Sequence, residues 1–187
     1  MINVQDLRKG IIFKYENDIW TVMTMEHIKP GKGGAIIKVR VRSHKKGNSK
    51  IMSFLSGERV EDIDIVERPV TYSYKDGRQY IFMDNETYEQ YSIDAEHCED
   101  VEKYIVPNTQ LSLNMHNNEI LSINIPNTAS LKVVYAEPTV KGNTATRPTK
   151  MVRVETGLEL NVPMFINEGD IIKIDTETGD YLERIKS

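Results

Sequence analysis

The chain has one cysteine, no long hydrophobic run and no signal-like start. Because Cys98 is the only cysteine among 187 residues, no disulfide can form within the chain, which favours a reducing, cytoplasmic location. No apolar run reaches the roughly 20 residues that a membrane-spanning helix needs, so we expect no membrane partner. The first residues lack a basic stretch followed by an apolar one, and we expect no secretory signal.

A catalytic constellation is also missing. The four histidines, His27, His44, His97 and His116, are scattered and do not have metal-ligand spacing. Cys98 follows His97, but no motif supports it as a nucleophile, and we expect an inert thiol that is half-buried or exposed. The sequence therefore predicts a protein that is not an enzyme and that needs no metal and no cofactor.

Long helical patterns are absent as well. Short runs rich in Ile, Val, Tyr and Thr alternate with Gly, Pro, Asn and Asp, which is typical of small β-barrels. The expected strands are 11–15, 19–26, 35–42, 59–66, 70–74, 78–83, 111–115, 119–125, 131–135, 151–154, 159–162, 171–174 and 181–185. Residues 94–105 are expected to form a short helix, and residues 139–150 an exposed loop.

Two proline-containing segments divide this pattern into three parts. Glu67-Arg68-Pro69 and Pro126-Asn127-Thr128 mark the expected boundaries. The predicted fold class is therefore all-β, with three small β-barrel domains at 1–65, 66–127 and 128–187. The middle segment resembles a small OB-like barrel, and the last two segments are predicted to share one topology.

Charge is distributed unevenly along the chain. Residues 1–65 carry 12 Lys and Arg against 8 Asp and Glu, a net +4, whereas residues 66–187 carry 12 against 20, a net −8. Within residues 26–50 there are eight basic residues and one acidic residue, Glu26. A basic end on an acidic body predicts a local polyanion contact. The alternative interpretation is a basic surface that is exposed to solvent and binds no partner.

The expected strand 35–42 separates its basic residues from its apolar ones. Period-2 alternation places Lys38, Arg40 and Arg42 on one face and Ala35, Ile37, Val39 and Val41 on the other. A cationic ladder of this kind suits a phosphate backbone, because arginine can bind phosphate bidentately. The ladder also supports an alternative hypothesis, a general OB/SH3-type RNA-binding protein.

A glycine-rich loop precedes that strand. Pro30 fixes its own φ, and the neighbouring glycines allow backbone conformations closed to other residues, which predicts a tight turn. Lys32 is its one prominent side chain. On this loop alone an incidental exposed lysine is the simpler interpretation. A phosphate-cradling loop is a weaker alternative, because Gly31-Lys32-Gly33 lacks the following Ser or Thr and helix.

Four separated stretches resemble bacterial elongation factor P, and together they span the chain in the family's order. They are Lys29-Pro30-Gly31-Lys32-Gly33, similar to the loop of the family's first domain; Asn85-Glu86-Thr87-Tyr88-Glu89-Gln90, similar to a stretch of its second domain; residues 150–169 with Val152, Gly157, Leu160, Val162-Pro163, Ile166 and Gly169; and the end from Gly179-Asp180-Tyr181 to Lys186. The resemblance implies an SH3/KOW-like barrel followed by two OB-fold barrels, in an L-shaped, tRNA-like arrangement and as a monomer.

The same resemblance implies a translation factor that binds the 70S ribosome between the peptidyl-tRNA and exit sites. There it would stimulate peptide-bond formation and relieve stalling at consecutive prolines by positioning the peptidyl-tRNA, especially prolyl-tRNA. Lys32 aligns with the family's tip residue, which contacts the tRNA CCA end and is extended by a lysine-modifying enzyme. The residues implied to shape this loop and contact tRNA are Lys29, Pro30, Gly31, Gly33 and Gly34. The basic ladder of Lys38, Arg40 and Arg42, predicted from the strand alternation, is the expected contact to the tRNA or rRNA backbone.

Two family sites carry substitutions in this chain. The third-domain loop that reads Gly-Asp-Thr in the family, and contacts the exit-site codon of mRNA there, is Gly142-Asn143-Thr144 here. Asparagine keeps a hydrogen-bonding side chain and removes a negative charge, so we expect this contact to persist. Glu99-Asp100 stands where the family usually has Gly-Asp, and we assign it no role.

Overall fold

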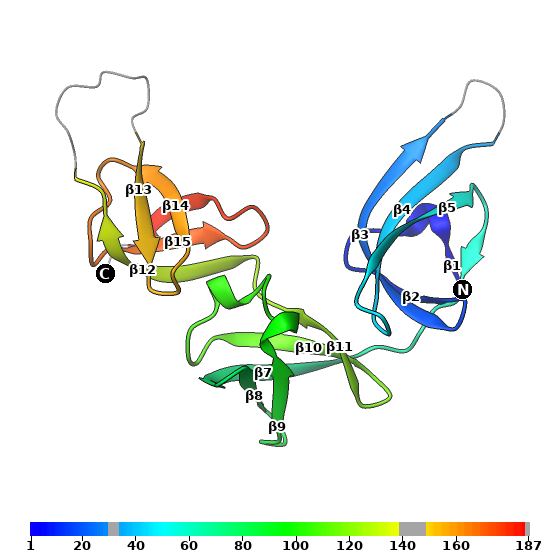
Figure 1. Ribbon diagram of the computed structural model, residues 1–187, viewed down its shortest axis with the longest axis horizontal. Coiled ribbons are helices and arrows are strands. Elements are labelled where there is room, and N and C mark those ends of the chain that lie inside the picture. The colour runs from blue at the N-terminus through cyan, green and yellow to red at the C-terminus, as the bar shows by residue number, and fades with distance from the viewer. Residues whose placement is uncertain (30–33, 139–148, 186–187) are drawn as a thin grey trace. The chain divides into compact units, whose positions relative to one another are not determined.

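The computed structural model describes residues 1–29, 34–138 and 149–185, and their regular secondary structure is almost entirely β-strand (Figure 1). The chain divides into two compact units, residues 1–66 with 116–121 and residues 67–115 with 122–187. The described helices are 3₁₀ turns of three residues, and none of them is long and apolar enough to span a membrane. The all-β prediction is confirmed, whereas the three predicted domain ranges stay a prediction.

A four-stranded antiparallel sheet in the order β2-β3-β4-β5 forms most of the first barrel. The elements of this barrel are β1 (Ile2–Asn3), η1 (Val4–Asp6), β2 (Ile12–Tyr15), β3 (Asp18–Ile28), β4 (Ile36–Ser43), β5 (Ser49–Leu55) and β6 (Arg59–Val60). β1 pairs with β6. Glu16 and Asn17 have φ values of 50° and 62°, the conformation that a two-residue hairpin turn between twisted strands requires.

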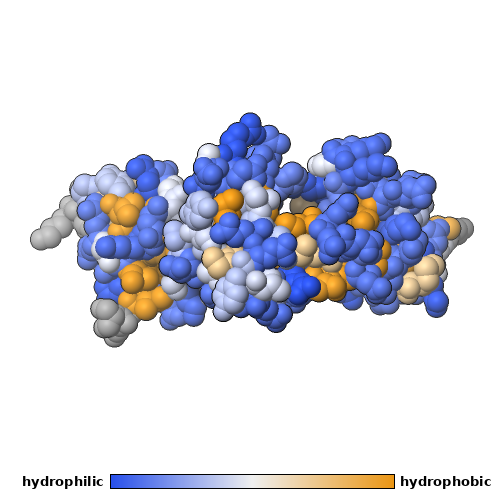
Figure 2. Space-filling model, turned by 90° about the horizontal axis from the view of Figure 1, so that it is seen from below, coloured by the Kyte–Doolittle hydropathy of each residue, from blue (hydrophilic) through white to orange (hydrophobic). Residues whose placement is uncertain are grey.

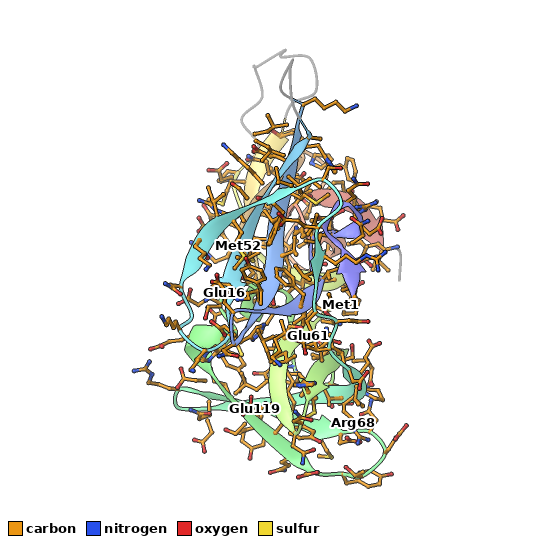
Figure 3. All side chains as sticks on the ribbon, turned by 90° about the vertical axis from the view of Figure 1, so that its right-hand side faces the viewer. Met1, Glu16, Met52, Glu61, Arg68 and Glu119 are labelled. Atoms are coloured by element: carbon orange, nitrogen blue, oxygen red, sulfur yellow. The ribbon has the colours of Figure 1, made fainter. Side chains whose placement is uncertain are left out.

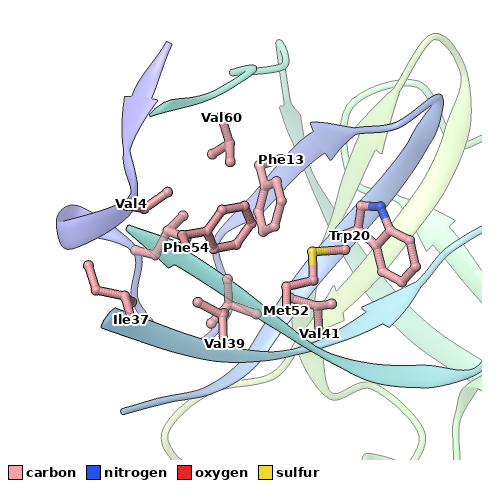
Figure 4. Close-up of a cluster of buried hydrophobic side chains, with 11 residues drawn as sticks. Val4, Phe13, Trp20, Ile37, Val39, Val41, Met52, Phe54 and Val60 are labelled. Carbon is pink, nitrogen blue, oxygen red and sulfur yellow. The ribbon is translucent and has the colours of Figure 1, made fainter. Parts of the chain in front are cut away.

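Alternating apolar residues of these strands form one buried core (Figure 4). Along β4, Ile37, Val39 and Val41 are buried while the residues between them are exposed. Burying a side chain of this size contributes roughly 1.5–3 kcal/mol to folding. Trp20 is buried too, and its indole N–H donates to the Tyr15 carbonyl at 3.0 Å.

The second barrel is a five-stranded sheet in the order β11-β10-β7-β8-β9. Its elements are β7 (Val66–Asp76), β8 (Gln79–Asp84), β9 (Gln90–Asp94), η2 (Ala95–His97), η3 (Glu102–Tyr104), β10 (Gln110–His116) and β11 (Glu119–Asn124). Tyr72 and Phe82 pack inside it with ring centroids 5.6 Å apart. Asn117 and Asn118, at φ 49° and 65°, form the turn between β10 and β11.

The third barrel is a five-stranded sheet in the order β14-β13-β12-β15-β16. Its strands are β12 (Thr128–Ala136), β13 (Thr149–Val154), β14 (Glu159–Pro163), β15 (Ile171–Asp175) and β16 (Tyr181–Ile185). In both five-stranded sheets the first strand lies between the second and the fourth, which is the strand pairing of an OB fold. The prediction that these two segments share one topology is confirmed.

Two expected elements are shorter or placed differently. β6 covers only Arg59–Val60 of the expected strand 59–66, because the polar residues that follow pair with a neighbour only through the bridge from Glu61 to Lys14. Pro69, expected in a boundary segment, lies within β7. Proline is tolerated there because pairing with β8 begins at the next residue.

The structure also differs from the expectation at several other places. β1, β5 and β9 are strands that the sequence pattern does not predict. The expected helix over residues 94–105 is instead two separate 3₁₀ turns. Lys150, expected in an exposed loop, is buried in β13 because the strand alternation turns its side chain toward the barrel. Residues 139–148 of that expected loop lie outside the described residues.

Candidate nucleic-acid interface

The outer face of β4 carries the basic ladder that the sequence predicts. Lys38, Arg40 and Arg42 are exposed, and each is followed by a buried residue. The alternation arises because the apolar residues between them belong to the core of the first barrel, so the charged side chains must point to solvent. The predicted separation of charge and core on this strand is confirmed.

The neighbouring strands add little negative charge to this face. β4 lies in the middle of β3, β4 and β5, so each basic residue has a neighbour on both sides. The residues opposite are Glu26 and Ser53 for Lys38, Thr24 and Ile51 for Arg40, and Thr21 and Ser49 for Arg42. Five of these six are uncharged and four carry hydroxyl groups, which can donate hydrogen bonds to phosphate oxygens. The face therefore keeps a positive character.

The described salt bridges of this barrel use other basic residues. Lys14 pairs with Glu61 at 3.2 Å and Lys50 with Glu16 at 3.7 Å; the two acidic residues are labelled in Figure 3. Lys50 also lies over the Trp20 ring, 4.4 Å from its centroid. Among the described residues, no ion pair neutralises the three basic residues of the ladder. Their charges are therefore available to a polyanion.

A basic turn follows the ladder, and Asp18 fixes its backbone. The Oδ1 atom of Asp18 accepts hydrogen bonds from the N–H groups of Ile19 at 2.8 Å and Lys45 at 3.3 Å, and Oδ2 accepts one from Ser43 Oγ at 2.5 Å. Burial raises the pKa of Asp18, but these hydrogen bonds outweigh burial and the pKa is lowered. The ionised carboxylate thus holds a turn on which Lys45 and Lys46 are exposed.

These two turn lysines extend the positive surface beyond Arg42. The strand alternation does not single out Lys45 or Lys46, because both lie past the end of the predicted strand. The signal that points to them is the excess of basic residues over 26–50. Arg42 itself donates from Nε to the Gly47 carbonyl at 3.3 Å, which ties its guanidinium to the same turn.

The glycine-rich loop joins β3 to β4 next to this face. Ile28 pairs with Ile36 across the two strands, so the segment between them leaves from one end of the sheet. Lys29 and Gly34 are exposed, and the space around Gly34 would admit a β-carbon. The remaining predicted loop residues lie outside the described residues: Pro30, Gly31, Lys32 and Gly33. The predicted codon-contact residues do as well: Gly142, Asn143 and Thr144.

The described residues offer little for catalysis. Cys98 is fully buried, so the expectation of a half-buried or exposed thiol is wrong. Burial raises its pKa to about 12, with smaller contributions from Glu102 and Asp94, so the thiol stays protonated at neutral pH. Within the described part of the chain, no three His, Cys, Asp or Glu side chains are placed to hold a metal ion.

Three family models match consecutive parts of the chain. The model described as "Elongation factor P (EF-P) KOW-like domain" matches residues 3–60, "Elongation factor P (EF-P) OB domain" matches residues 65–123, and "Elongation factor P, C-terminal" matches residues 129–184. Together with the observed strand pairing, these matches confirm a KOW-like domain and two OB-type domains. The predicted L-shaped arrangement stays a prediction.

Relatives named elongation factor P match over the full length. The relative from Finegoldia magna is 42% identical over 185 residues, which cover 99% of this chain and 100% of that protein. The relative from Moorella thermoacetica is 41% identical over 184 residues, which cover 98% of this chain and 100% of that protein. The chain belongs to the elongation factor P family, which makes it a translation factor and not an enzyme.

Proposed function

We propose that this elongation factor binds the 70S ribosome between the peptidyl-tRNA and exit sites and relieves stalling at consecutive prolines. The observation that carries the proposal is the exposed row Lys38, Arg40 and Arg42, which no ion pair within the described residues neutralises, on the sheet whose strands β3 and β4 the glycine-rich loop joins. RNA is the polyanion that this row would meet on a ribosome, with contacts to the tRNA or rRNA backbone.

The mechanism we propose is positioning. Proline is a rigid and poor nucleophile, so its peptide bond forms slowly, and a correctly held peptidyl-tRNA would shorten the search for a reactive geometry. Lys32, extended by a lysine-modifying enzyme, would contact the CCA end. Its role is supported by the sequence and by family membership. The residues proposed to shape the loop are Lys29, Pro30, Gly31, Gly33 and Gly34.

The remaining assignments follow from the same family membership. Gly142, Asn143 and Thr144 are proposed to contact the exit-site codon of mRNA. The protein is proposed to act as a cytoplasmic monomer. A general OB/SH3-type RNA-binding function is the second candidate, because the ladder on β4 would serve any RNA backbone.

Ribosome profiling after depletion of the protein separates the two candidate functions. The proposed function predicts ribosome pauses concentrated at consecutive proline codons, and these pauses should disappear when the wild-type chain is restored. A general RNA-binding protein predicts pauses or abundance changes with no enrichment at proline runs. That second pattern would overturn the proposed function.

A further inference from the structure

Tyr88 is an exposed aromatic residue in a backbone conformation that tyrosine rarely adopts. Its side chain is 73% exposed, the largest exposure of an aromatic residue in the described ranges, and its φ is +61°. A bulky residue at positive φ is strained, because its β-carbon approaches the backbone carbonyl oxygen. The molecular face drawn in Figure 2 is mostly hydrophilic, with a few hydrophobic patches.

A second turn in the chain shows that the turn geometry does not require tyrosine. Residues 84–89 and 175–180 form the same hydrogen-bonded turn, in the second and third barrels. In each, the first aspartate accepts from the N–H groups two and three residues later, and a threonine Oγ1 accepts from the last residue of the turn. The residue equivalent to Tyr88 is Gly179, at φ +80°. Glycine fits this position without strain, so the ring of Tyr88 serves something other than the turn.

Hydrogen bonds fix the backbone of Tyr88 and tie down the turn beside it. Its N–H donates to the Asp84 carbonyl at 3.0 Å. On the flank, Thr71, Asn85 and Gln110 form a closed ring of side-chain hydrogen bonds between 2.6 and 2.8 Å. A ring on a rigid turn loses little conformational entropy when a partner covers it, which is the property of aromatic anchor residues at protein interfaces.

The charge around Tyr88 selects the chemistry of that partner. Glu86 and Glu89 are exposed beside it, and among the described residues neither takes part in a salt bridge. Asp84 lies buried beneath, where hydrogen bonds from the Thr87 and Glu86 N–H groups hold the pKa of its carboxyl below the usual value. The exposed carboxylates of Glu86 and Glu89, with the buried Asp84 beneath them, outnumber the nearby Arg68 and leave this surface negative, which repels phosphate and attracts cationic side chains.

We propose that Tyr88, Glu86 and Glu89 form a docking site for a basic segment of a ribosomal protein. An arginine of the partner would stack on the Tyr88 ring while basic side chains pair with the two glutamates. This contact uses residues other than those of the cationic ladder on β4, which we propose to bind RNA. The inference rests on the proposed function only in naming the ribosome as the source of the basic partner.

Site-specific photocrosslinking on 70S ribosomes tests this directly. p-Benzoylphenylalanine replaces Tyr88 in the full chain, and in a matched control it replaces Tyr74, an aromatic residue of β7 that is 50% exposed. We expect position 88 to crosslink to a protein, in a product that survives ribonuclease and is lost with protease. A crosslink to rRNA at position 88, or a yield no higher than at position 74, would overturn the proposal.

A second test measures the affinity of Tyr88 variants for 70S ribosomes. Tyr88→Gly should bind 70S ribosomes roughly tenfold more weakly, with an unchanged or raised Tm because glycine relieves the positive φ. Tyr88→Asn, which also tolerates this conformation, should lose the same affinity, whereas Tyr88→Phe should keep it. Unchanged affinity in both the Gly and Asn variants would contradict the docking site. The proposed function is tested separately, by synthesis of a proline-run peptide with the variant Lys32→Ala, and neither binding measurement depends on that result.

Discussion

The hydroxyl group of Tyr104 lies over Gly179, 3.2 Å from the point that a β-carbon on that glycine would occupy. Tyr104 comes from η3 in the second barrel, yet it belongs to the buried core of the third. Next to it, Thr156 Oγ1 donates to the Lys103 carbonyl at 2.7 Å. η3 therefore joins these two barrels in two ways. The Tyr104 ring packs in the core of the third barrel, and the Lys103 carbonyl accepts the hydrogen bond from Thr156.

Tyr104→Ala should destabilise the unit that contains both barrels. Removing a buried aromatic ring leaves a cavity, and we expect a loss of about 3–5 kcal/mol in the free energy of unfolding. Urea denaturation followed by tyrosine fluorescence measures this loss, because Trp20, the chain's one tryptophan, lies in the other unit. Tyr74→Ala, which removes an exposed ring, is the control and should change stability by no more than about 0.5 kcal/mol. Equal effects of the two substitutions would contradict the role of Tyr104 as a core residue.

Gly179→Ala should also destabilise the fold, and Tyr104→Phe should partly compensate. Alanine at φ +80° costs about 1–2 kcal/mol through the backbone alone, and its β-carbon would crowd the Tyr104 hydroxyl. Removing that hydroxyl leaves the backbone cost but relieves the crowding. A double-mutant cycle by thermal unfolding measures the difference. An identical penalty in both backgrounds would show that the hydroxyl group does not limit position 179.

Asp84→Asn should flatten the acid dependence of stability. Hydrogen bonds from the Thr87 and Glu86 N–H groups lower the pKa of the folded-state carboxyl below its usual 3.8. The carboxylate therefore stabilises the fold above that value, and this contribution is lost as the pH falls through the lower, folded-state pKa. We expect the Tm of the wild type to fall more steeply than that of the variant between about pH 5 and about pH 2.

The control for this experiment is Asp76→Asn, in the exposed hairpin between β7 and β8. It should follow the pH dependence of the wild type, since the side chain of Asp84 is unaffected. Parallel curves for the wild type and Asp84→Asn would rule out the depressed carboxyl as a source of acid sensitivity.

The strand pattern of this chain could be predicted wherever one face is apolar and the other polar. β4 is the clearest case, with Ile37, Val39 and Val41 inside and the charges outside. β5 could not be predicted in this way, because Ile51 and Leu55 are apolar residues on its solvent-exposed face, 62% and 58% exposed. The alternation of apolar and polar residues indicates a strand only when one face is buried and the other is polar, so a strand with an apolar exposed face is missed.

The packing of residues 94–105 could not be derived from local sequence. A polar run suggested one helix, but Asp94 caps only a single turn, through its bond to the Glu96 N–H at 3.0 Å. Tyr104 then enters the core of another barrel, a long-range contact for which no local signal exists. The candidate ladder was predictable because it depends on alternation alone. The turn that carries Lys45 and Lys46 was not, because it depends on the distant Asp18.

Reversing the charge of Arg40 and Arg42 to glutamate should weaken ribosome binding and reduce its dependence on salt. Each phosphate contact that is lost should lower the slope of log K against log salt by roughly 0.7–0.9. The difference from the wild type should therefore be largest at low salt and narrow as salt rises. Lys132→Glu, an exposed reversal on β12, is the control. A variant whose slope equals that of the wild type would exclude phosphate contacts at the ladder.

The most direct test of the proposed function is synthesis of a triproline peptide by purified ribosomes with and without this protein. The wild-type chain, isolated with its native modification, should accelerate formation of the Pro-Pro bonds, while a peptide without proline should form at the same rate in both reactions. Lys32→Ala, with thermal unfolding unchanged from the wild type, should lose this acceleration. Equal acceleration by the folded Lys32→Ala variant would contradict the claim that the protein acts through Lys32.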